Sequence, residues 1–374
     1  MQQEPARDRS FDALRYVFLC LIVVYHAGLV YGAPAWRVTS PEQSGAALFV
    51  SHMAAGVHLA GFFMLAGLFA RGARGAGLDA AAGWLAGRAR RLLVPCLATM
   101  VLLNPIQIAA PVLAEPGPDR GARLLAAFAS PGAWIAHAWF LLALFQMSAL
   151  LALAGLRSWP GLSRLLAAPP AAVICAAALG TGLWLALVAA LLAQGLPRYP
   201  LFGLLRVGDL LQFGPFFLFG LALARAPALR AAYLRPGAPG LAAGGLAVVA
   251  WAGVFALGLP QGPVTAALSG VYAILGGRLI FAMAAAWLDR PSAVERAGRE
   301  LGLLIYLVHQ PVLVALAVLL LGWPGDPVVE WIGLSLATLA LSTLLARGIA
   351  AAPPLALLFA GEGGRAAPRR PAPT

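Results

Sequence analysis

Apolar runs of about 20 residues recur along nearly the whole chain, and a helix of that length crosses a hydrocarbon core of roughly 30 Å. Lipid offers no hydrogen bonds, so backbone groups must be satisfied within each segment, which makes these runs helices rather than open strands. Only 11% of the residues are charged and 61% are hydrophobic, whereas roughly a quarter of an ordinary soluble domain is charged. The sequence therefore predicts an all-α, polytopic transmembrane bundle and excludes a soluble domain.

Charged residues and clusters of Pro and Gly divide the chain into about ten predicted spans. A single transmembrane domain is expected over residues 1–360, and the Gly-, Pro- and Arg-rich stretch 361–374 is typical of a disordered tail. No internal repeat is visible, which disfavours a transporter built from inverted repeats. The predicted spans are 16–33, 46–70, 92–113, 134–156, 171–194, 208–225, 239–259, 264–288, 302–322 and 328–350.

The basic residues predict the orientation. All 26 are arginines, and with both termini in the cytoplasm twenty of them lie inside, five outside and one within a span. The positive-inside rule favours this arrangement. The net charge of +12 then reflects membrane topology and contact with anionic lipid. Nucleic-acid binding is not expected, because no soluble face gathers the arginines.

Ionisable groups inside a membrane are costly, so their presence there indicates function. All five histidines, His26, His52, His58, His137 and His309, fall in or at the ends of predicted spans. Counting about 1.5 Å per residue puts His26 and His58 near the midplane, His309 nearer the cytoplasm, and His52 and His137 toward the outer face. Any one of them could instead simply hydrogen-bond a neighbouring helix.

Arg15 and His26 are eleven residues apart, and eleven steps of about 100° return almost to the starting angle. The two side chains therefore face the same way, with a rise of roughly 16 Å between them. A cation at the cytoplasmic mouth and an imidazole at mid-depth suit a long ligand with an anionic end and a reactive end, such as an acyl thioester of coenzyme A. A snorkelling Arg and a packed His are the alternative.

A second cluster, Arg88, Arg90 and Arg91, stands at the predicted cytoplasmic start of the third span. Arginine binds phosphate bidentately, so this cluster is suited to the phosphates of such a ligand. A cluster that only satisfies the positive-inside rule is the alternative.

Six segments, spread from Arg15 to Pro311, resemble the type 3 family of membrane acyltransferases, and within it the branch that succinylates periplasmic glucans. Arg15 and His26 match its Arg, ten residues, His spacing, and Arg88 and Arg91 match its Arg-x-x-Arg entry. The other similar segments, in the same order as in the family, are GFFMLAGLFA (61–70), HAWFLLALF (137–145), FGPFFLFGLALAR (213–225) and LIYLVHQPV (304–312).

The resemblance implies an acyltransferase domain over residues 1–360 in a bacterial inner membrane. It would move an acetyl or succinyl group from cytoplasmic acyl-CoA, as co-substrate, to a hydroxyl of an extracytoplasmic glycan. No metal and no permanently bound cofactor is expected. The matched positions suggest His26 as the catalytic residue and Arg15, Arg88 and Arg91 as donor-binding residues. His58 stands where the family has an Arg-x-Pro.

The residues fit this chemistry. A hydroxyl attacks a thioester poorly unless a base removes its proton, and imidazole, with a pKa of about 6.5, suits that work. We therefore expect His26 to deprotonate the acceptor hydroxyl, with an acyl-His intermediate as the alternative route. His58, His137 and His309 are candidates for orienting the acceptor. Trp139 and Tyr306 could offer faces to a sugar, or could only pack between helices.

Two other classes of protein stay open. A transporter or flippase of a glycan or lipid-linked substrate is possible for a ten-helix protein, and Arg278 and Asp209 are intramembrane charges that could pair. A metal or haem redox protein is disfavoured, because no two histidines have helical i,i+3 or i,i+4 spacing. His52 and His58, six apart on one expected helix, would point about 120° from each other.

Overall fold

The computed structural model describes residues 8–33, 36–70, 77–115, 117–153, 165–320 and 325–361, and every regular element in these residues is helical. Ten segments among them are long and apolar enough to cross a membrane. This confirms the predicted fold class and number of spans. The tail beyond Gly361 lies outside the described residues, so its expected disorder stays a prediction.

Seven spans consist of one unbroken helix each. Their ends lie within three residues of the predicted bounds, except that the first helix begins at Arg9 instead of residue 16. These helices are α1 (Arg9–Gly32), α10 (Pro170–Ala193), α11 (Val207–Arg225), α13 (Ala238–Ala256), α14 (Pro263–Trp287), α16 (Gly302–Leu320) and α17 (Pro327–Ala351).

The other three spans are interrupted. The second consists of α2 (Gly45–Ala55) and α3 (His58–Phe69). The break between them separates His52 from His58, so the angle expected for one continuous helix does not apply. The fourth consists of α7 (Pro131–Ile135), the 3₁₀ turn η2 (Ala136–Ala138) and α8 (Trp139–Leu153). Irregular backbone at membrane depth is tolerated where other helices cover it.

The third span differs most from its prediction. It consists of α4 (Gly77–Ala98), the π-helical turn η1 (Thr99–Leu103) and α5 (Asn104–Ala114). The prediction that this helix starts at residue 92 is wrong, because the Ala- and Arg-rich stretch before it has high helix propensity and continues the helix beyond the apolar part. Arg88 and Arg91 therefore lie inside α4.

Short helices lie between the spans and, in the case of α18, after the last one. They are α6 (Arg120–Ala129), η4 (Leu201–Gly203), α12 (Pro227–Leu234), α15 (Ala293–Glu300) and α18 (Pro353–Ala360).

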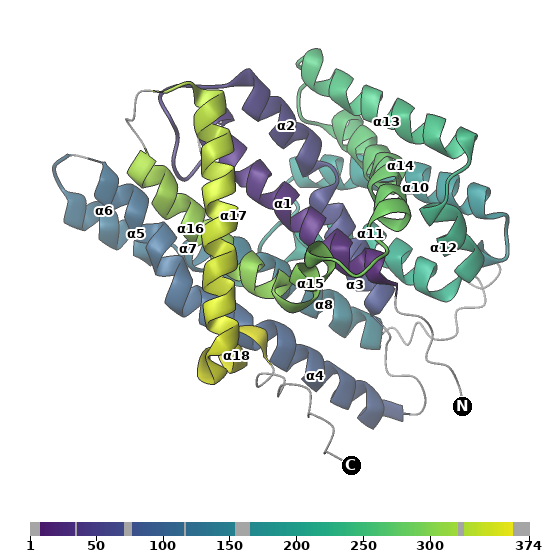
Figure 1. The fold of residues 1–374 in the computed structure, drawn as a ribbon, viewed down its shortest axis with the longest axis horizontal. Helices are drawn as coiled ribbons and strands as arrows, with labels where there is room; N and C mark the ends of the chain where they lie inside the picture. The colour runs from purple at the N-terminus through teal and green to yellow at the C-terminus, as the bar shows by residue number, and fades with distance from the viewer. Residues whose placement is uncertain are drawn as a thin grey trace.

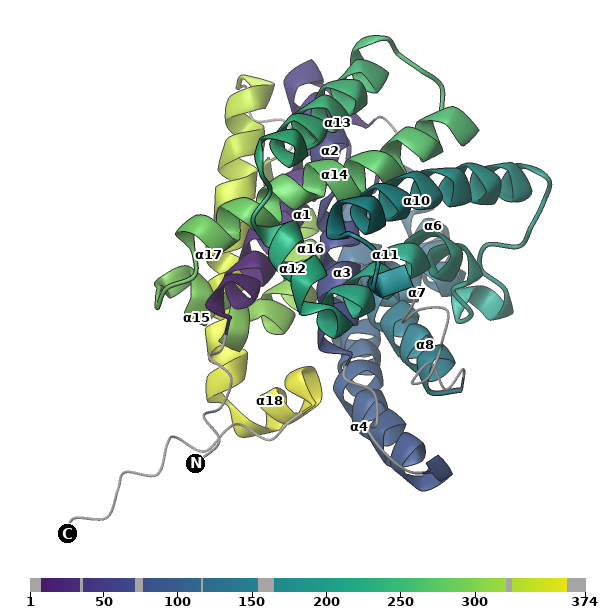
Figure 2. The same cartoon turned by 90° about the vertical axis from the view of Figure 1, so that its right-hand side faces the viewer.

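Helix α1 crosses the middle of the bundle, with α16 and α17 on one side and α13, α14 and α10 on the other (Figure 1). It contacts α2, α3, α14, α15, α16 and α17. Figure 2 shows α10 and α14 side by side and the first turns of α4 extending away from the other helices. A functional group on α1 can therefore meet side chains from many other elements.

Helices α3 and α11 cross in direct backbone contact. A Cβ atom on Gly67 would overlap the carbonyl oxygen of Phe217, and one on Gly220 would overlap that of Met64. Lipid provides no hydrophobic force between helices, so close approach through small residues is a main source of packing energy. The two glycines fix α3, and with it His58, against α11.

We predict that Gly220→Leu destabilises the folded protein by about 3 kcal/mol, because a larger side chain meets backbone that cannot yield. Thermal unfolding in detergent checks this. Gly214→Leu is the matched control, since nothing lies within 4 Å of a Cβ at Gly214 on the same helix. Equal stability of the two variants would show that the glycine crossing does not hold the bundle.

Candidate active site

Three histidine rings from three spans meet inside the bundle. The His26 ring from α1 lies 5.4 Å from the His309 ring of α16, centroid to centroid, and the His309 ring lies 5.5 Å from the His137 ring of η2. The expectation that His137 and His309 lie at different depths is therefore wrong. The depth count assumed straight helices, whereas the fourth span is broken just at His137.

Hydrogen bonds assign the protons of the His26–His309 pair. Nδ1 of His309 lies 2.5 Å from the carbonyl oxygen of Tyr306, and since a carbonyl only accepts, this Nδ1 carries a proton. The buried ring is neutral because burial disfavours the charged form, so its Nε2 accepts. It accepts from Nδ1 of His26, 3.2 Å away. The proton of His26 is then on Nδ1, and its Nε2 holds a free lone pair.

The surroundings of His26 leave that lone pair available. His309 and His137 are buried, but His26 keeps part of its surface accessible. Its Nε2 makes no hydrogen bond to a described residue, and this nitrogen is not fully buried. This nitrogen is therefore neither bonded to a described residue nor completely enclosed by the protein.

Both nitrogens of His137 are engaged. Its Nε2 donates to the carbonyl oxygen of Leu307 at 2.8 Å, and its Nδ1 accepts from the Gln107 amide at 3.2 Å. The hydroxyl of Tyr306 donates to the carbonyl oxygen of His137. His137 and Tyr306 thus join the fourth span to α16, and neither has a spare proton-transfer atom in this structure.

Gln107 and Asn104 were missed from the sequence. Asn104 accepts from Gln107 at 2.6 Å and donates to the carbonyl oxygens of Trp134 and Ile135, at 2.5 and 3.2 Å. These bonds hold the broken backbone before His137. Two buried amides in an otherwise apolar span were the signal that could have revealed them.

His58 contributes a second open acceptor. Its Nδ1 donates to the carbonyl oxygen of Ala54 at 2.6 Å, which leaves Nε2 unprotonated, buried and without a partner. The ring lies 4.9 Å from that of Tyr25, and the Tyr25 ring lies 5.0 Å from that of His26. The buried Oε1 of Gln310, next to His309, also lacks a partner.

The three expected donor-binding arginines lie on two helices. Arg15 forms an ion pair with Asp12 on α1, its guanidinium lies 4.5 Å from the centre of the Phe69 ring, and its side chain stays 33% exposed. On α4, the Arg88 guanidinium lies 5.4 Å from the centre of the Trp84 ring, and its Nε is buried without a partner. Arg91, one turn further on, is exposed.

Trp139 belongs to a different group of side chains. Its ring stacks on Phe213 at 5.7 Å and lies 5.3 Å from the guanidinium of Arg206. Within the described part of the chain it makes no ring contact with a histidine. Trp139 therefore packs α8 against α11, and the structure does not bring it to the histidine cluster.

The expected pairing of Arg278 with Asp209 is wrong. Asp209 pairs with Arg206, three residues earlier, at 2.5 Å, and Arg278 donates to the carbonyl oxygens of Ala232 and Tyr233 at 2.6 and 3.2 Å. Residues three apart in a helix are neighbours on its surface, so the local partner is available without any movement of helices. Neither charge is left to attract a transported ion.

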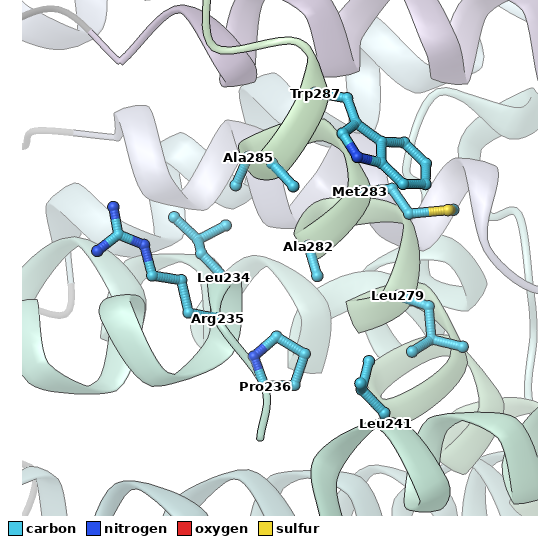
Figure 3. Close-up of a pocket in the computed structure, with 10 residues that line it drawn as sticks. Leu234, Arg235, Pro236, Leu241, Leu279, Ala282, Met283, Ala285 and Trp287 are labelled. Carbon is cyan, nitrogen blue, oxygen red and sulfur yellow. The ribbon is translucent and has the colours of Figure 1, made fainter. Parts of the chain in front are cut away.

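A groove of about 540 Å³ lies apart from the histidines, between the end of α12, α13 and α14 (Figure 3). Its lining is apolar except for Arg235, and Trp287 and Met283 stand at its wall. Among the described residues, no group of three or more His, Cys, Asp or Glu side chains is arranged to hold a metal ion.

The tautomers of the cluster can be measured. In ¹⁵N-histidine NMR spectra of the protein in bilayers, we expect His26 and His309 to be protonated on Nδ1 and His137 on Nε2, because of the acceptors that each nitrogen faces. The signal of His26 is identified by its loss in His26→Gln. A His26 protonated on Nε2 would remove the proposed free lone pair.

The comparisons with known proteins agree with the sequence resemblance. A family model described as an acyltransferase domain, that of the acyltransferase 3 family, matches residues 8–347. No curated protein and no solved structure matches the chain. The match covers all ten spans apart from the last few residues of α17. The chain therefore belongs to the acyltransferase 3 family and is a multi-pass membrane acyltransferase.

Proposed function

We propose that this protein moves an acetyl or succinyl group from cytoplasmic acyl-CoA to a hydroxyl of an extracytoplasmic glycan, with both termini in the cytoplasm of a bacterial cell and the bundle in its inner membrane. The observation that carries the proposal is the hydrogen bond between His26 and His309, which leaves Nε2 of His26 as an unprotonated nitrogen without a partner among the described residues. The distribution of arginines supports the orientation.

His26 acts as the general base. Its Nε2 takes the proton of the acceptor hydroxyl as the oxygen attacks the thioester carbonyl. The new carbon–oxygen bond forms, the carbon–sulfur bond breaks, and the departing CoA thiolate takes the proton from Nε2. His309 is a positioning residue, because its bond to Nδ1 fixes the tautomer and orientation of His26. Attack by Nε2 itself, giving an acyl-His intermediate, is the alternative route and uses the same nitrogen.

Arg15, Arg88 and Arg91 would bind the donor. Each is a permanent cation, and the buried unpartnered Nε of Arg88 provides a donor that a phosphate oxygen could accept. Arg15 lies eleven residues before His26 on the unbroken helix α1, so the rise of about 16 Å between them is retained. A pantetheine arm could extend along this face toward the imidazole.

The acceptor would approach from the other end of α1. The unpartnered Nε2 of His58 and Oε1 of Gln310 are acceptors that sugar hydroxyls can satisfy. His137 and Tyr306 support the site through the backbone rather than touching substrate, since their polar atoms are already bonded. Trp139 is not proposed as a sugar platform.

Replacing the base should abolish most of the activity. In proteoliposomes with radiolabelled acetyl-CoA or succinyl-CoA and candidate glycans, His26→Ala should lower kcat by roughly 10²- to 10⁴-fold, the usual contribution of a general base. His52→Ala is the control, because His52 stacks on Trp251 at 4.2 Å and is not a member of the cluster. If a folded His26→Ala protein transferred the acyl group at the wild-type rate, His26 would not be the general base.

Removing the donor-site cations should weaken acyl-CoA binding and leave the chemical step intact. Each charge-assisted hydrogen bond contributes about 1.5–3 kcal/mol, so Arg88→Ala with Arg91→Ala should raise the Kd for CoA by about tenfold or more. Arg90→Ala, the exposed arginine between them, is the matched control. Unchanged affinity for CoA in the double variant would show that these arginines determine only the membrane topology.

A further inference from the structure

The segment after α1 is fixed over the end of that helix, away from Arg15. Backbone NH groups of Ser40 and Ser44 donate to the carbonyl oxygens of Val30 and Tyr31 at 2.9 and 2.6 Å. Val38 is only 4% exposed and belongs to the core cluster that also contains Tyr31. Residues 36–44 are therefore a built part of the protein rather than a free loop.

This segment reaches the histidine cluster. The Trp36 ring stacks on the His26 ring, with centroids 6.0 Å apart and an angle of 21° between the planes. The next residue is Arg37, so this stacking contact fixes the backbone of Arg37 one residue away from the ring that packs on His26. Arg37 thus belongs to the segment that packs on the proposed reaction centre, at the end opposite to the donor arginines.

Arg37 is partly buried but makes no hydrogen bond or ion pair with any described residue. Burial lowers its pKa, and no carboxylate of a described residue acts in the opposite direction. The two buried arginines among the described residues have partners from the chain itself: Arg206 has Asp209, and Arg278 has two carbonyl oxygens. A partly desolvated cation is costly without such a partner, so a ligand is the natural candidate to supply one.

We propose that Arg37 binds an anionic group of the substrate beside His26, and so makes the enzyme selective for a substrate that carries a carboxylate or a similar anion near the reacting atoms. This rests on the proposed function. Two parts of the reaction could supply the anion. One is the free carboxylate of a dicarboxylic acyl group on the donor, and the other is an acidic group on the acceptor glycan.

Arginine is suited to this role at such a position. Its planar guanidinium binds a carboxylate through two parallel hydrogen bonds, and these are strong where water is partly excluded. A neutral acyl group and a neutral glycan would leave the cation unpaired in the reacting complex. Arg37 thus discriminates between substrates, because a substrate without an anion leaves the guanidinium charge unpaired. A substrate with an anion pairs that charge and is favoured.

The test uses the full-length protein in proteoliposomes and four substrate combinations: succinyl-CoA or butyryl-CoA, each with a neutral glucan or a carboxylated glycan. In Arg37→Gln we expect kcat/KM to fall by about 10- to 100-fold for the combinations that carry the recognised anion. The other combinations should change less than about threefold. Arg37→Lys should recover part of the loss, and Arg120→Gln, an exposed arginine on α6, is the matched control.

The pattern identifies the source of the anion. A loss that follows succinyl-CoA with either glycan assigns it to the acyl group, and a loss that follows the carboxylated glycan with either donor assigns it to the acceptor. An equal effect of Arg37→Gln on all four combinations, or no effect on any, overturns the role of Arg37. If the wild-type protein shows no transfer that depends on His26 in any of the four combinations, the proposed function itself is overturned.

Discussion

A buried polar group without a hydrogen-bond partner costs several kcal/mol in an apolar interior, and this cost governs the arrangement of the bundle. It makes every span helical, since only then do the backbone groups satisfy one another. It also explains the partners of the buried cations. Asp209 binds Arg206, and the guanidinium of Arg278 binds two carbonyl oxygens at the end of α12.

The same rule makes the exceptions informative. Four of the polar groups without a partner in the described chain are His26 Nε2, His58 Nε2, Gln310 Oε1 and the guanidinium of Arg37. They belong to, or lie next to, one cluster of side chains. Three of these groups are hydrogen-bond acceptors and one is a cation. A substrate hydroxyl can therefore donate a hydrogen bond to this cluster, and an anionic group can bind to it. Polar groups left unsatisfied together are expected where a substrate completes the set.

Broken helices bring these groups together. His58 is the first residue of α3, directly after the break in the second span, and His137 lies in the 3₁₀ turn of the fourth. At such breaks nearby carbonyls also bond to side chains: Ala54 accepts from His58 as well as from the NH of Val57, and Trp134 and Ile135 accept from Asn104. Polar residues are therefore needed at breaks, and they become available to the site.

The sequence by itself determined the ten spans, the family and the spacing of Arg15 and His26, because hydropathy and helical periodicity are properties of neighbouring residues. It did not reveal that α4 begins fifteen residues before the predicted start, since helix propensity carries a helix past the apolar run. The tertiary structure alone decided which histidines meet. His26 and His309 are 283 positions apart, and a hydrogen bond over that separation depends on how the helices pack. Packing also brought the segment that contains Arg37 to His26. In the sequence, Arg37 contributed only to the prediction of membrane topology.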